Sequence, residues 1–165
     1  YLNDYGYIKT EEILKSSVGA APIFVRVNTI KTNTCELIDL LNKEGIASQK
    51  VSDVDNALEI LDGNSLFKSK CFTEGLFHAQ DLASQKCIEA LSPKKGEVVF
   101  DMCSAPGGKS FTMAQYMENS GNIYSFDLYE HKIKLINDGA HRLGIKIIDA
   151  QVGDASVFNS KCSSN

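Results

Sequence analysis

The chain has 165 residues, 43% of them hydrophobic, and its 17 basic and 21 acidic side chains give a net charge of −4. This length suits one domain, or a small domain with part of another. No apolar run is long enough to span a membrane, and the acidic balance argues against nucleic-acid binding driven by bulk charge. The start lacks the basic and apolar regions of a signal peptide, and without an initiator methionine the numbering is expected to begin inside a longer protein.

The cysteines are spaced too widely for a metal site, with no C-x-x-C pair and no nearby pair of histidines. An odd number of cysteines without a signal peptide is typical of the reducing cytoplasm, where we expect this protein. The five cysteines are Cys35, Cys71, Cys87, Cys103 and Cys162.

The first part of the chain predicts a small mixed unit. Residues 4–17 favour a helix, with Ile13 and Leu14 available for packing. Residues 24–28 alternate apolar and polar side chains, as a half-buried strand does. A capped helix that ends at Gly45 and a strand over residues 57–61 follow.

The second part predicts strands and helices in alternation. Asp81 is expected to cap a helix that runs to Leu91. Repeats of strand and helix of this length indicate a right-handed, mostly parallel sheet, so the fold class is α/β. The expected strands cover 98–101, 122–127 and 145–152, and the helices between them cover 109–117 and 131–143.

A turn rich in small residues joins the first of these strands to its helix. It contains Cys103, Ser104, Ala105, Pro106, Gly107, Gly108 and Lys109. Ligands of open α/β sheets bind at this edge, and glycine lets the backbone approach them closely. Cys103 replaces the first glycine of a phosphate-binding loop, and the only glycines are adjacent, so both nucleotide fingerprints fail on spacing.

Acidic residues stand at the carboxyl ends of all three expected strands. One strand–helix repeat separates each acid from the next, and the three are Asp101, Asp127 and Asp154. Because the carboxyl ends of parallel strands meet at one edge of the sheet, we expect the three side chains to line one crevice. An ionised carboxylate has two oxygens that can accept hydrogen bonds. Asp127 would accept from both hydroxyls of a ribose, and Asp154 from the exocyclic amine of adenine. Asp101 would offset positive charge on the ligand, and the alternative for each acid is a helix N-cap.

The string from Asp101 to Ser110 is similar to motif I of the Sun (Fmu) family of RNA cytosine-5 methyltransferases, most of all to its small-subunit ribosomal RNA enzymes. Phe24 to Thr29 resembles the family's Arg-x-Asn-Thr strand, and Gly75 to Asp81 its Gly-x-x-x-x-Gln-Asp segment. The resemblance implies a small α+β accessory region over residues 1–72. It also implies the first half of a Rossmann-like methyltransferase sheet over residues 73–165.

The resemblance implies S-adenosylmethionine as the cofactor, bound by the turn from Cys103 to Lys109 and by the three acids. It implies methyl transfer to cytosine in small-subunit ribosomal RNA. Arg26 on the expected strand, and Lys109, are the candidates for RNA contact, although Arg26 could instead lie exposed on a polar face. His78 lacks a carboxylate or nucleophile in sequence reach and is expected to be structural.

Cytosine-5 methylation needs a cysteine nucleophile, which the family places in later Pro-Cys and Thr-Cys motifs. None of the five cysteines matches these, so we expect the catalytic cysteines beyond Asn165 and a chain that is inactive alone. A methyltransferase of another substrate and a non-catalytic RNA-binding module remain alternatives, and a phosphate-loop nucleotidase is a more distant one. An incomplete sheet leaves an open edge, which predicts self-association.

Overall fold

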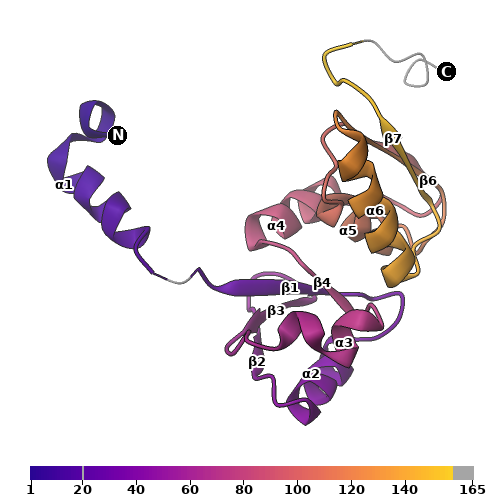
Figure 1. Cartoon of the computed structure of the whole chain (residues 1–165), viewed down its shortest axis with the longest axis horizontal. Helices are drawn as coiled ribbons and strands as arrows, with labels where there is room; N and C mark the ends of the chain where they lie inside the picture. Colours follow the sequence, from indigo (N-terminus) through magenta and orange to yellow (C-terminus); the bar gives the residue numbers. More distant parts are fainter. Residues whose placement is uncertain (20, 158–165) are drawn as a thin grey trace.

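A computed structural model describes residues 1–19 and 21–157 of the chain. Two sheets form its body, and helix α1 (Leu2–Ser16) projects away from both (Figure 1). A kink at Gly6 interrupts α1, and none of its residues is buried. Ile13 is half-buried and Leu14 exposed, and neither belongs to a hydrophobic core cluster of the described residues.

The first sheet is antiparallel, with the order β2-β3-β1-β4. Its strands are β1 (Ile23–Val27), β2 (Ser48–Lys50), β3 (Ala57–Ile60) and β4 (Phe77–Ala79). Helix α2 (Thr34–Lys43) begins where Asn33 accepts a hydrogen bond from the N–H of Glu36. Its buried Leu37 and Leu41 pack on the sheet, next to the turn η1 (Leu66–Lys68) and the short helix α3 (Lys70–Thr73).

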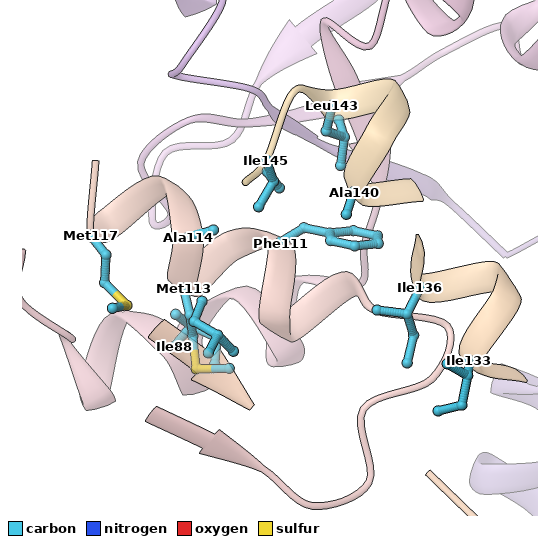
Figure 2. Packing of buried hydrophobic residues seen from close by; sticks show 11 residues of the cluster. Ile88, Phe111, Met113, Ala114, Met117, Ile133, Ile136, Ala140, Leu143 and Ile145 are labelled. Carbon is cyan, nitrogen blue, oxygen red and sulfur yellow. The ribbon is translucent and has the colours of Figure 1, made fainter. Parts of the chain in front are cut away.

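The second sheet is parallel, in the order β5-β6-β7, as the alternating elements predict. Its strands are β5 (Val98–Asp101), β6 (Asn122–Asp127) and β7 (Ile148–Val152), and its helices are α4 (Leu82–Leu91), α5 (Gly108–Tyr116) and α6 (Glu130–Leu143). Phe111 of α5 points toward Ala140 of α6 in the apolar core of this unit (Figure 2). This core holds α5, and with it the turn before α5, in a fixed position.

The apolar run Val98-Val99-Phe100 predicts a buried strand, but β5 is partly exposed. Val98 is 55% exposed and Phe100 36% exposed, and the Phe100 ring stacks on that of Tyr124 with centroids 5.2 Å apart. Val98 and Phe100 share one face of the strand, and β5 is also an edge strand of the sheet in the described part of the chain.

The two units meet along a closely bonded junction. Asn28 Nδ2 donates to the carbonyls of Gly75 (2.7 Å) and Leu143 (2.8 Å), and Arg142 donates to the carbonyl of Phe72 (2.7 Å). Gly75 has a φ of +72°, and a Cβ there would overlap the carbonyl of Arg142. The segment after β1 that carries Asn28 is thus fixed against the end of α6.

Strand β4 pairs with β1, so the first sheet takes one strand from beyond residue 72. The chain then passes directly from β4 into α4 of the second unit. No helix in the described residues combines the length and the hydropathy needed to cross a bilayer.

Candidate functional site

The turn between β5 and α5 is tied to the end of β6. The N–H and the hydroxyl of Ser104 both donate to the carbonyl of Phe126, each at 2.9 Å. Gly107 has a φ of +108°, and a Cβ there would overlap the ring of Phe111. Glycine is needed here both for the backbone conformation and for the packing of α5 under the turn.

Asp127 lies at the end of β6 with one partner on each carboxylate oxygen. The N–H of Ala105 donates to Oδ2 at 3.1 Å, and the Nζ of Lys132 lies 3.4 Å from Oδ1. Desolvation raises the pKa of Asp127, but these two partners outweigh it and hold the pKa below its usual value. The carboxylate is therefore ionised and oriented by the turn itself.

A cavity of about 320 Å³ opens beside Asp127, between the turn and the ends of β6 and β7. Its lining residues are Met102, Cys103, Asp127, Leu128, Tyr129, Lys132, Gly153, Asp154 and Ala155. We call it the acidic cavity, because two of the three acids picked out in the sequence lie on its wall. Apolar and aromatic side chains face the same space, which suits a flat heterocycle.

Asp154 is exposed on the wall of the acidic cavity. Its Oδ1 accepts hydrogen bonds from the N–H (2.8 Å) and the hydroxyl (2.7 Å) of Ser156. The hydroxyl, followed by the N–H, lowers the pKa of Asp154, so its carboxylate is ionised at neutral pH. The site therefore contains two negatively charged acceptors.

Asp101 is placed differently from the other two acids. Its Oδ2 accepts a 2.7 Å hydrogen bond from Ser110 of α5, whose hydroxyl lies 2.9 Å from that of Ser125. Asp101 lines neither of the cavities described here. Its observed contact joins β5 to α5 below the turn, so the structure groups Asp127 with Asp154 and sets Asp101 behind them.

A second cavity, of about 190 Å³, also borders the turn, and we call it the interdomain cavity. One wall is the segment that leaves β4 and starts α4, and the other is the turn. Its lining residues are Ala79, Gln80, Asp81, Ser84, Cys103, Ser104, Ala105, Pro106, Gly108 and Lys109. Cys103 lines both cavities, so the two lie next to each other at the turn.

The expectation that Arg26 contacts an RNA phosphate is wrong. Arg26 is 3% exposed, and its Nε and Nη1 donate to Gln115 Oε1 (3.2 Å) and to the carbonyl of Asp55 (3.0 Å). The guanidinium also lies 5.2 Å from the ring centroid of Tyr116. It is enclosed between the first sheet and α5, because the second unit packs on the face of β1 that the sequence reads as polar.

His78 is buried against the same interface and lines neither cavity. Burial, reinforced by the charge of Arg26, lowers its pKa to about 3. The neutral ring lies 3.4 Å from the hydroxyl of Thr112. These contacts agree with a structural role.

The sequence did not point to Ser84, Tyr129 or Lys132 as parts of the site. Lys132 stands five residues after Asp127 in the first turn of α6, a position from which it can reach back to the strand end. Ser84 stands three residues after Asp81 in the first turn of α4. A polar residue in the first turn of a helix, a few positions after an acid at a strand end, is the sequence pattern that could have identified Lys132 and Ser84.

Comparison with known proteins places the chain in a family. Residues 88–165 match the family described as 16S rRNA methyltransferase RsmB/F, and residues 1–66 match the RsmF/B-like ferredoxin-like domain. The chain belongs to the RsmB/F methyltransferase family, and its second sheet is part of a Rossmann-like methyltransferase fold.

Among individual proteins, the probable ribosomal RNA small subunit methyltransferase B of Bacillus subtilis is 38% identical over 151 residues, covering 92% of this chain and 34% of that protein. A methyltransferase homologue from Pyrococcus horikoshii matches in structure with a TM-score of 0.82 at 32% identity, over 92% of this chain and 50% of that one. The crystal structure of NSun6 from Pyrococcus horikoshii with SFG has a TM-score of 0.87 at 22% identity, over 94% and 64% of the two chains, and so shares the fold. The chain spans about a third of the length of the curated relatives it matches.

S-adenosylmethionine is the methyl donor of this family, and the residues of the acidic cavity fit it. The vicinal hydroxyls of a ribose are donors, and the oriented carboxylate of Asp127 is an acceptor on both oxygens. The exposed carboxylate of Asp154 matches an exocyclic amine in the same way. The side chains present therefore suit an adenosine.

Proposed function

We propose that this chain holds S-adenosylmethionine for an RNA methyltransferase that modifies carbon 5 of cytosine in small-subunit ribosomal RNA. The observation that carries the proposal is the bond from the N–H of Ala105 to Asp127, which builds the motif turn and the ribose acceptor into one site. When bound, the donor supplies an electrophilic methyl group on a sulfonium.

Each part of the site has an assigned role in this proposal. Asp127 accepts from the ribose hydroxyls, and Asp154 accepts from the adenine amine. The turn from Cys103 to Lys109 holds the sulfur and the amino-acid end of the donor. Asp101, which lies behind the turn and lines neither cavity, offsets the donor's positive charge from there. Residues 1–72 form the accessory region, and residues 73–165 belong to the methyltransferase domain.

The RNA assignment is supported by the printed functions of the relatives. They include ribosomal RNA and tRNA cytosine-5 methyltransferases. With Arg26 buried, the exposed ammonium of Lys109 at the rim of the interdomain cavity is the candidate from the sequence that can reach an RNA phosphate.

The chemical step needs a thiolate that adds to carbon 6 of cytosine. Four cysteines lie in the described residues, and Cys162 lies outside them. Cys103 sits in the turn that holds the donor, and burial raises the pKa of Cys71 to about 12 as its thiol donates to Glu44. We assign the nucleophile to none of the four, so the chain by itself is expected to bind the donor without transferring its methyl group.

The test is calorimetric titration of the chain with S-adenosylhomocysteine and, separately, with ATP. The proposal expects saturable binding of the first and none of the second. A methyl-transfer assay with isotope-labelled donor and small-subunit ribosomal RNA is expected to give no product. Binding of ATP in place of the nucleoside thioether would contradict the donor assignment, and methylation of another substrate would contradict the RNA assignment.

We also propose that the chain self-associates through β5. Val98 and Phe100 leave apolar surface at an open sheet edge, and such edges pair with further strands.

A further inference from the structure

The buried guanidinium of Arg26 bonds to three separate segments of the chain. Its Nη1 donates to the carbonyl of Asp55 (3.0 Å), in the loop before β3, and to Oε1 of Gln85 on α4 (3.5 Å). Its Nε donates to Oε1 of Gln115 on α5 (3.2 Å). One side chain of the first sheet thus holds both of the helices that begin at the interdomain cavity.

The two glutamine amides depend on Arg26 for a hydrogen-bond donor. Gln85 is 0% exposed and Gln115 is 5% exposed, and among the described residues Arg26 is the one donor to each amide oxygen. Because buried polar atoms are normally paired, loss of the guanidinium leaves both oxygens without a partner. The Nε2 of Gln85 in turn donates to the carbonyl of Gln80 (3.0 Å), between β4 and α4. The network therefore extends from β1 to the segment where α4 begins.

The charge of Arg26 is not neutralised by an ion pair. No carboxylate of the described residues lies within ion-pair distance of the guanidinium, whose partners are neutral oxygens and the ring of Tyr116. Burying such a charge is costly, and a set of apolar side chains of similar volume would avoid that cost. A planar guanidinium, however, can direct several donors to fixed positions at once. The network is therefore better explained by what it holds in place than by the stability it contributes.

Helices α4 and α5 carry the walls of the donor site at their starts. Asp81 caps α4, and the turn that ends at Gly108 leads into α5. The two helices also share an apolar core that includes Ile88 and Met113 (Figure 2). Apolar contacts are non-directional, whereas hydrogen bonds require a defined distance and angle. The bonds of Arg26 therefore fix how α4 and α5 lie relative to each other.

We propose that Arg26 is a positioning residue for the methyl-donor site, which it shapes by holding α4 and α5 in a fixed relation to the first sheet. Arg26 lines neither cavity, so its effect passes through Gln85 and Gln115. The inference rests on the proposed function and extends it, because it makes the affinity for the donor depend on a buried residue of the accessory region.

The test measures the affinity for S-adenosylhomocysteine in variants of this network. Arg26→Lys keeps the charge but replaces the fork that reaches both amides by a single ammonium. Gln115→Met keeps the volume of the side chain and removes the acceptor on α5. We expect each variant to bind about ten-fold more weakly, the loss that follows when one charge-assisted hydrogen bond to the ligand is misaligned. The double variant should bind no more weakly than Arg26→Lys, because both changes remove the same contact.

Leu41→Ala separates positioning from a general loss of stability. Leu41 is buried in the core of the first unit, in a cluster that contains no residue of α4 or α5, and its truncation destabilises the fold by leaving a cavity. At a temperature where thermal unfolding shows every variant to be folded, Leu41→Ala should bind S-adenosylhomocysteine as the wild type does. In amide NMR spectra of the unliganded chains, the signals of Gly107 and Gly108 should shift in Arg26→Lys and keep their wild-type positions in Leu41→Ala.

Each outcome decides one question. Wild-type affinity in Arg26→Lys and Gln115→Met, or glycine signals that do not shift in Arg26→Lys, would overturn the positioning role and leave Arg26 as a structural contact alone. A loss of affinity in Leu41→Ala as large as that in Arg26→Lys would also overturn it, since destabilisation would then be the cause. A wild-type chain that does not bind S-adenosylhomocysteine contradicts the proposed function itself, and the inference fails with it.

Discussion

The backbone N–H of Ala105 lies 3.1 Å from Oδ2 of Asp127 and donates to it, which joins the turn after β5 to the carboxyl end of β6. Residues from two strand–helix repeats thereby form one binding surface. Neither residue can move without disturbing the other, because the hydroxyl of Ser104 holds the same turn to Phe126.

Asp127→Asn is expected to weaken donor binding. The substitution replaces one carboxylate oxygen of Asp127 by an amide group that donates. The negative charge that attracts Lys132 is lost, and fewer acceptors remain for the ribose hydroxyls. A hydrogen bond to a charged group contributes about 1.5–3 kcal/mol, which corresponds to a loss of about 10- to 100-fold in affinity. Calorimetry with S-adenosylhomocysteine measures this, and an affinity equal to that of Asp138→Asn would show that Asp127 is not the ribose acceptor.

The sequence correctly predicted the positions of those parts of the site that are built from residues close together in the chain. The turn, its glycines and the strand-end acids follow from short-range patterns, and so do the N-cap of Asp81 and the parallel sheet.

The sequence could not show what lies between the two units. Arg26 meets Gln115, which is 89 positions away, and Asn28 meets Leu143, which is 115 positions away. A strand of alternating pattern shows that one face is polar, but not that a second unit will cover that face. The walls of the interdomain cavity also come from distant segments, the end of β4 and the turn before α5, which the resemblance to the family had linked and the residue pattern alone could not.

Arg26→Met is expected to destabilise the chain and to leave RNA affinity unchanged. The variant leaves the buried Oε1 of Gln115 without its donor, at about 1–3 kcal/mol, and also removes the bond to the partly buried carbonyl of Asp55. Chemical denaturation should therefore show a loss of about 3 kcal/mol, while Lys43→Met on exposed α2 should show little. Loss of RNA affinity in an Arg26→Met chain of undiminished stability would restore the phosphate-contact role.

His78 is expected to make stability depend on pH. Its pKa is lowered from 6.5 to about 3 in the folded chain, so folding favours the neutral ring. This contribution is fully present above pH 6.5 and is lost as the pH falls from there toward the folded value, because the unfolded chain then binds a proton that the folded chain does not. The slope approaches about 1.4 kcal/mol per pH unit for this one group.

The measurement is the free energy of unfolding of wild-type, His78→Gln and His131→Gln chains between pH 7 and pH 5, above the range in which carboxylates titrate. Wild type and His131→Gln should lose stability together as the pH falls, since His131 is exposed. His78→Gln is expected to start lower and to change less. A slope in His78→Gln equal to that of wild type would show that another group is responsible.

Self-association through β5 is expected to respond to a charge placed on the strand edge. Val98→Lys puts a lysine, a residue that natural edge strands use against pairing, at the exposed start of β5. Sedimentation velocity over a range of concentrations should show association of the wild-type chain and a shift toward monomer in this variant. Exposed Leu14 on α1 offers a matched substitution, Leu14→Lys, because α1 also exposes several large apolar side chains. If Leu14→Lys dissociates the complexes and Val98→Lys does not, α1 forms the contact. A wild-type chain that stays monomeric at every concentration would exclude both surfaces.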